Sequence, residues 1–154
     1  MSRVTFDVYG SAQPQGSKTK MPNGAMLEGG TADLRDNRRN WRSAVADAAA
    51  NALADQLNGR QMDGPLSLDV VFRAPMPASR PKWMRALGCW WKPTAPDLDK
   101  LVRSVGDSLT ASGLIKDDAR IVALRAMKIE VDGWTGATIS VHEIGNEPAD
   151  EVIW

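Results

Sequence analysis

The sequence predicts a single α/β domain in which a mixed β-sheet packs against two main helices. Apolar residues alternate with polar ones in four segments, which is the period of a half-buried strand. They recur at helical spacing in two longer segments. The chain has 154 residues, the size of one domain with a core of its own. Strands and helices are interleaved along it, which favours helices layered on a sheet.

The first half of the chain contains one predicted strand and one predicted helix. Val4, Phe6 and Val8 alternate with polar residues, so we expect a strand over 4–8. Residues 10–37 are rich in Gly, Pro and Ser and are expected to form a loop. The alanine-rich segment 38–57 predicts a helix, ended by "NGRQMDG". Its expected inner face consists of Trp41, Val45, Ala48, Ala52 and Leu57.

The second half contains the remaining elements. Residues 65–72 alternate and predict a second strand, followed by an expected loop over the proline-rich segment 74–96. A helix is expected over 99–112, with Gly113 as its C-terminal cap. Two strands follow at 120–131 and 137–144, joined by "DGWTG" in what reads as a hairpin-like turn. Residues 145–154 are expected to be a terminal tail. The helix face consists of Leu98, Leu101, Val102, Val105 and Leu109.

Composition and charge limit the function classes. No apolar run is long enough to span a membrane, and Cys89 is the only cysteine, which excludes an internal disulfide and a Cys-based zinc site. We therefore expect a cytosolic protein. Net charge is zero, but residues 1–92 carry 13 Lys and Arg against 8 Asp and Glu, whereas residues 93–154 carry 6 against 11. This division suits a nuclease, in which carboxylates hold a cation and Lys and Arg bind phosphates. The alternative is that the uneven distribution of charge arose by chance and has no functional meaning.

Four carboxylates flank the second helix. Asp97 and Asp99 stand at its start, where an aspartate commonly caps free N–H groups, and Asp117 and Asp118 follow its end, where one of them suits a turn. The helix is roughly 20 Å long. Asp118 therefore meets Asp97 only if a neighbouring subunit supplies it or if the chain doubles back, and the sequence leaves both open. Converging carboxylates without His or Cys indicate Mg²⁺, with Mn²⁺ as a substitute.

In this segment the sequence resembles the RusA family of Holliday junction resolvases, many of which are carried by bacteriophages and prophages. The family pattern has two aspartates one residue apart, a helix with a basic residue and "D-x-L", then Gly and Asp-Asp. Weaker likeness extends over the whole chain. The matching positions are Asp97, Asp99, Lys100, Leu101, Arg103, Asp107, Leu109, Gly113, Asp117 and Asp118.

The resemblance implies a homodimer that binds four-way DNA junctions and cuts two strands symmetrically with Mg²⁺, in a bacterial or phage-infected cytoplasm. It implies metal-binding catalytic roles for Asp97, Asp99 and Asp118, with Asp117 as a possible additional ligand. Arg103 occupies the place of a functional lysine of the family. Arginine keeps the charge and the ability to bind phosphate but does not lose a proton, so a proton-transfer role does not survive the change.

Basic residues outside this motif are candidates for nucleic-acid contacts. The loop with Lys18 and Lys20 either touches DNA phosphates or is simply solvated. The segment "RPKWMRALGCWWK" interleaves cations with Trp83, Trp90 and Trp91, so it could stack on splayed bases. A hydrophobic loop that covers the sheet or contacts a second subunit is the favoured interpretation. The full set of expected nucleic-acid contacts is Lys18, Lys20, Arg38, Arg42, Lys82, Lys92 and Lys100.

The preferred hypothesis is a dimeric, Mg²⁺-dependent, structure-selective endonuclease for branched DNA, with Asp107 as a surface partner of Arg103. Its main alternative is a non-catalytic protein that binds branched DNA and keeps the fold. A phosphohydrolase for a small substrate would not need the basic loops. An interaction module, in which all the aspartates are caps and turns, would show no stabilisation by metal.

Overall fold

The computed structural model describes residues 2–16 and 18–145. None of the helices in this part of the chain is long and apolar enough to cross a membrane. In chain order the elements are β1 (Arg3–Tyr9), β2 (Lys18–Lys20), β3 (Met26–Glu28), α1 (Ala32–Leu57), β4 (Leu66–Pro75), α2 (Lys82–Ala86), β5 (Cys89–Trp91), α3 (Leu98–Ser112), the 3₁₀ turn η1 (Asp118–Arg120), β6 (Ile121–Val131) and β7 (Gly136–Glu143).

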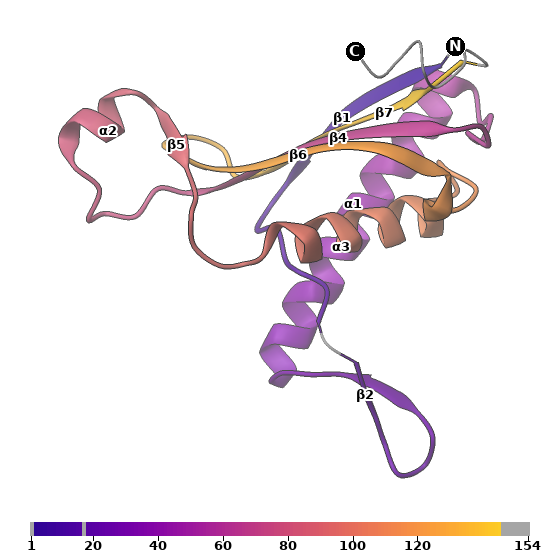
Figure 1. Cartoon of the computed structure of the whole chain (residues 1–154), viewed down its shortest axis with the longest axis horizontal. Coiled ribbons are helices and arrows are strands. Elements are labelled where there is room, and N and C mark those ends of the chain that lie inside the picture. Colours follow the sequence, from indigo (N-terminus) through magenta and orange to yellow (C-terminus); the bar gives the residue numbers. More distant parts are fainter. Residues whose placement is uncertain (1, 17, 146–154) are drawn as a thin grey trace.

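A five-stranded mixed sheet forms the body of the molecule, in the order β1-β7-β4-β6-β5. β4 and β6 are parallel, and the other neighbours are antiparallel. Both long helices, α1 and α3, lie on one face of this sheet (Figure 1). The predicted fold class, one α/β domain with two main helices on a mixed sheet, is confirmed.

The hydrophobic core lies between the sheet and the two helices. Side chains that alternate along β4 are all buried, as their spacing predicts. On α1 the structure buries Ala49 as well as the predicted Ala52, whereas the predicted Ala48 and Leu57 are only half-buried. The buried residues of β4, α1 and α3 include Leu66, Leu68, Val70, Phe72, Trp41, Val45, Ala52, Leu101, Val105 and Leu109.

The first long helix begins six residues earlier than predicted. Thr31 caps α1, and its hydroxyl accepts a hydrogen bond from the backbone N–H of Leu34 at 3.3 Å. The first turns of α1 carry mostly exposed polar residues, so no apolar periodicity marks them. The end of α3 agrees with prediction, because Gly113 adopts the left-handed conformation (φ 81°) that a C-terminal cap requires.

Both predicted loops contain regular structure. The 10–37 segment holds the small β2–β3 sheet and the start of α1, and the 74–96 segment holds α2 and β5. Each forms a projection from the body: the β2–β3 hairpin extends from the start of α1, and the α2–β5 arm extends beyond the ends of β4 and β6 (Figure 1). Strands of three residues are shorter than the run of four to eight in which alternation is recognisable, and a helix of five residues is little more than one turn, so the sequence pattern does not reveal them. Of the predicted tail 145–154, all but residue 145 lies outside the described residues.

The predicted hairpin between the last two strands is wrong. β6 and β7 do not pair with each other; β4 lies between them, parallel to β6 and antiparallel to β7. A turn sequence indicates that the chain reverses direction, but it does not indicate which strand pairs with the next one in the sheet. The last residue of "DGWTG" is Gly136, with φ 141°, where an added Cβ would lie 1.8 Å from the backbone oxygen of Val8. The close β1–β7 pairing therefore needs glycine there.

Candidate active site on helix α3

Asp97 begins α3 without capping it. The residue occupies the N-cap position, yet its carboxylate makes no capping hydrogen bond. Its neighbour is Lys100, whose Nζ lies 3.5 Å from Asp97 Oδ2, and both side chains are largely exposed. Capping therefore does not explain this aspartate. Asp99, in the first turn, is also exposed.

The two aspartates after α3 differ in role: Asp117 has a structural one, whereas no turn or cap explains Asp118. The Asp117 carboxylate accepts a hydrogen bond from the backbone N–H of Ala119 at 2.8 Å, so it forms the predicted turn. That hydrogen bond is the main reason why the pKa of Asp117 lies below its ordinary value. A hydrogen bond with Asp117 raises the pKa of Asp118, and burial and the negative charges of Asp117 and Asp107 raise it further. Asp118 therefore sits where negative charge accumulates.

The chain doubles back, so Asp118 reaches the middle of α3. A Cβ placed on Gly106 would lie 3.6 Å from Asp118 Cβ and 4.0 Å from its Oδ2. These distances are those of ordinary van der Waals contact, so Asp118 packs against the helix at Gly106. Seven residues separate Gly106 from Asp99, which is ~10 Å along the axis. Doubling back thus shortens the gap between the two ends of the motif but does not close it within one chain.

A pocket of about 390 Å³ surrounds Asp118. It is lined by Gln15, Gly16 and Lys18 from the first loop and hairpin, and by Arg103, Asp107 and Asp118. The loop is fastened to α3 by a hydrogen bond from the backbone N–H of Gln15 to the oxygen of Lys100, at 3.1 Å. The structure thus brings the predicted Lys18, Arg103 and Asp118 together, with both signs of charge.

Asp107 is a site residue that the sequence interpretation undervalued. Its spacing predicts a surface partner of Arg103, whereas the structure places it in the lining of the pocket, where its charge acts on Asp118. Its position four residues after Arg103, itself four after Asp99, places all three along one stripe of α3. The spacing of four residues could have indicated that Asp107 shares a helix face with Asp99 and Arg103. The packing of Asp118 against that face is a tertiary contact, which the sequence pattern does not show.

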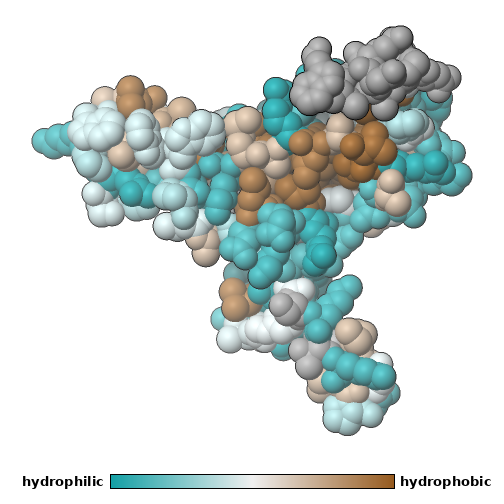
Figure 2. Space-filling model, in the orientation of Figure 1, coloured by the Kyte–Doolittle hydropathy of each residue, from teal (hydrophilic) through white to brown (hydrophobic). Residues whose placement is uncertain are grey.

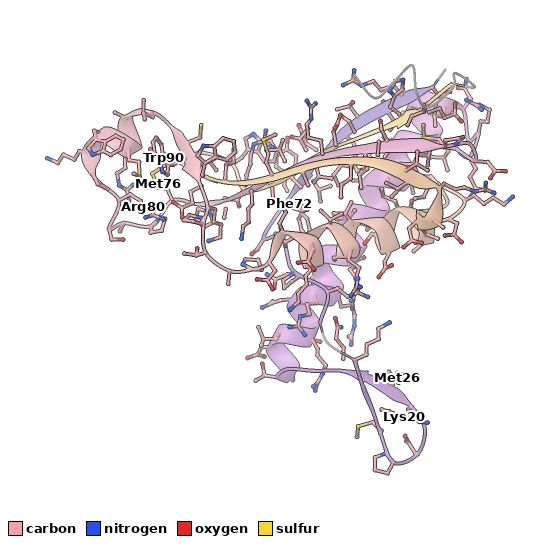
Figure 3. The ribbon with its side chains drawn as sticks, viewed as in Figure 1. Lys20, Met26, Phe72, Met76, Arg80 and Trp90 are labelled. Carbon is pink, nitrogen blue, oxygen red and sulfur yellow. The ribbon has the colours of Figure 1, made fainter. Side chains whose placement is uncertain are left out.

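Two predicted nucleic-acid residues hold the hairpin instead of projecting from it. Arg42 donates from its two Nη atoms to the Glu28 carboxylate at 3.2 and 3.1 Å, and Arg38 Nη1 donates to the backbone oxygen of Gly29 at 2.6 Å. Glu28 also accepts from the backbone N–H of Gly16 at 2.7 Å. These bonds fix the base of the β2–β3 hairpin beside the pocket. Lys20 lies far out along the hairpin, next to Met26 of the paired strand (Figure 3).

The tryptophan segment forms the α2–β5 arm and does not cover the sheet (Figure 1). Trp83 and Trp90 pack edge to face with ring centroids 5.4 Å apart. Arg80 binds Glu130 of β6 through two bonds of 2.8 Å, and the Glu130 side chain is fully buried. Arg80 and Trp90 lie together in the arm (Figure 3). The predicted contact Lys82 is exposed on α2.

The donor set fits a hard divalent cation, but one chain does not gather it. Aspartate oxygens are the ligands that Mg²⁺ prefers. The pKa of Asp118 is raised mainly by the hydrogen bond with Asp117 and by burial, and the negative charges of Asp117 and Asp107, which a cation would offset, raise it further. Within residues 2–16 and 18–145, however, no three His, Cys, Asp or Glu side chains lie close enough together to hold a metal ion. The catalytic and metal-binding roles of these aspartates thus stay predictions.

Comparison with known proteins assigns the family. No curated protein matches the sequence significantly. The family model described as endodeoxyribonuclease RusA matches residues 8–142, which is most of the chain and includes the whole 97–118 motif. The chain therefore belongs to the RusA endodeoxyribonuclease family, a family of DNA-cutting hydrolases.

Proposed function

We propose that this protein is a Mg²⁺-dependent, structure-selective endodeoxyribonuclease that resolves four-way junctions by paired, symmetric cuts. The observation that carries the proposal is the return of Asp118 to α3, beside Arg103, Asp107 and Lys18. The return of the chain thereby brings Asp118 to the helix that begins at Asp97 and Asp99, next to cations that can bind a phosphate. Such a site suits hydrolysis of a phosphodiester better than a structural role.

Each residue has a role in this proposal. Asp97, Asp99 and Asp118 hold the cation, and Asp117 orients Asp118. Arg103 and Lys18 position the phosphate, since both are exposed cations on the pocket wall. A Mg²⁺ ion bound by these carboxylates supplies Lewis-acid polarisation of the phosphoryl oxygen and lowers the pKa of an attacking water.

A second copy of the chain is part of the proposal, because symmetric cuts in two strands need two sites. β6 offers a surface for it. Its outer edge pairs only with Cys89–Trp91 among the described residues, and Val122 and Leu124 expose 65% and 55% of their surface. Apolar side chains gather at the level of β6 in the space-filling view (Figure 2). An open edge strand with exposed apolar side chains is a ready surface for pairing.

Cleavage of labelled four-way junctions, compared with linear duplex of the same sequence, tests this function. We expect paired symmetric cuts in Mg²⁺, none in EDTA, and at least a hundredfold loss of rate for Asp99→Asn. Asp55→Asn is the matched control, since Asp55 is exposed at the far end of α1 and should leave the rate unchanged. Analytical ultracentrifugation of the same samples should give a dimer.

The outcomes separate the proposal from its main alternative. Tight junction binding without cutting would identify a non-catalytic branched-DNA-binding protein, a reading favoured by the absence of a three-carboxylate cluster in the described part of the chain. In that case Mg²⁺ should also leave the melting temperature unchanged, whereas a ligated site is stabilised by mass action. Equal cutting of junction and duplex would refute structure selectivity.

A further inference from the structure

A second pocket, of about 130 Å³, lies where the α2–β5 arm joins the body. Three cations line it, each from a different part of the chain: Arg73 near the end of β4, Lys92 just after β5, and Lys128 of β6. No Asp or Glu is among the described residues that line it. All three cations are half-buried, so their charges are held near one another in partial shelter from water.

Hydrogen bonds fix the three cations in place without neutralising them. Lys128 Nζ donates to the backbone oxygens of Thr94 and Pro96, at 2.6 Å each, and Lys92 Nζ donates to Thr94 Oγ1 at 3.1 Å. Arg73 donates from Nη1 to Thr138 Oγ1 at 2.7 Å. Every acceptor is a neutral oxygen. An ammonium group has three donors and a guanidinium five, so each cation keeps donors to spare.

No carboxylate of the described residues forms a salt bridge with these cations; Asp7 is linked to Arg73 only through the Thr138 hydroxyl, which accepts from Arg73 and donates to Asp7. None of the eight salt bridges in that part of the chain involves Arg73, Lys92 or Lys128. Glu130 is the acid whose pKa responds to Lys92, but its carboxylate is already bound by Arg80, the main cause of its lowered pKa. Three preorganised cations with no carboxylate bound directly to them favour an anion as the fourth component.

We propose that this pocket binds a phosphate oxyanion, and that its source is a backbone phosphate of the DNA substrate. Pockets for drug-sized ligands are about 300–1,000 Å³, so a site this small suits a single tetrahedral group. Pro96 lines the pocket and immediately precedes Asp97. A phosphate held there is therefore next to the predicted catalytic helix. The assignment of its source rests on the proposed nuclease function; the oxyanion site itself does not.

Two experiments test the two parts of this inference. The first measures binding of a four-way junction in EDTA over a series of salt concentrations, for the wild type, Lys92→Gln and Arg125→Gln. Each phosphate contact adds about one unit to the slope of log affinity against log salt concentration. Lys92→Gln should therefore flatten the slope by about one unit. Arg125→Gln is the matched control: it removes the same charge from β6, but Arg125 pairs with Asp69 on the opposite face of the sheet.

The second experiment titrates inorganic phosphate and follows the Arg73 Nε–H signal by ¹H–¹⁵N NMR, with sodium chloride at equal ionic strength as the control. A phosphate-specific shift that Lys92→Gln weakens supports the oxyanion site. No shift, together with an unchanged salt slope for Lys92→Gln, overturns it. A shift with an unchanged slope supports the oxyanion site but overturns DNA as its source. If the wild type binds no DNA at all, the proposed function and the DNA source both fail, and the phosphate titration alone decides the oxyanion site.

Discussion

Replacing Arg80 by Met should weaken the attachment of the α2–β5 arm to the sheet and destabilise the protein. Arg80 holds the buried Glu130 carboxylate through two bonds of 2.8 Å, and this ion pair joins the arm to β6. Arg80→Met leaves that carboxylate without its partner. Removing one partner of a buried ion pair costs about 3–5 kcal/mol. Because 27% of the Arg80 side chain is exposed, water reaches the pair, and we expect the lower value.

Thermal unfolding measures the effect. A cost near 3 kcal/mol corresponds to a fall in melting temperature of roughly 6–12 °C for a chain of this size. The double variant Arg80→Met/Glu130→Met should recover most of the loss, since an apolar pair of similar volume avoids the uncompensated charge. A single variant as stable as the wild type would refute the reasoning, as would a double variant less stable than the single one.

The same pair predicts a dependence on pH. The bond with Arg80 lowers the pKa of Glu130 from its ordinary value of 4.5. A carboxyl group with a lowered pKa in the folded state stabilises the fold above the unfolded pKa and loses that contribution as pH falls through the folded value. The difference in unfolding free energy between wild type and Arg80→Met should thus be largest near neutral pH and shrink as the pH falls, because the buried, unpaired carboxylate of the variant is protonated first. A difference that grows on acidification would contradict this account.

Three further substitutions test the fold and the hairpin. Gly136→Ala should destabilise the protein by about 3 kcal/mol or more, because the new Cβ would lie 1.8 Å from the backbone oxygen of Val8 and the residue has φ 141°. Chemical denaturation measures this loss of stability, and a near-neutral effect would be inconsistent with the β1–β7 pairing. Leu109→Ala should cost about 2–5 kcal/mol in the same assay, since the side chain is fully buried in the core. Glu28→Gln removes the charged partner of Arg42 and should speed amide exchange in the β2–β3 hairpin while the central sheet keeps its protection; unchanged hairpin exchange would show that the pair does not hold it.

The longer elements could be predicted because their patterns are local. Alternation along 65–72 places Leu66, Leu68, Val70 and Phe72 on one face, and the structure buries all four. The helical spacing in α3 and the cap at Gly113 were equally readable. The β2–β3 hairpin, α2 and β5 were missed, since elements of three to five residues are too short for their pattern to be recognised.

The order of the strands in the sheet could not be predicted from local sequence patterns. The turn before β7 reads as a hairpin in sequence, yet β4 occupies the slot between β6 and β7. Strand order depends on which hydrogen-bonding edges are free after every other strand has packed. No residue near the turn records that outcome.

The sequence by itself determined the inventory of the candidate site: the aspartates of the 97–118 motif, Arg103 on the helix between them, and a family pattern specific enough to name a nuclease family that the comparison then confirmed. The tertiary structure decided which of these meet. It placed Asp118 against Gly106, made Asp107 its neighbour, turned Arg38 and Arg42 into anchors of the hairpin, and gathered Arg73, Lys92 and Lys128 around one pocket. The physical reason is that residue type and spacing fix chemistry and local conformation, whereas the contacts between distant segments depend on how the whole chain packs its core.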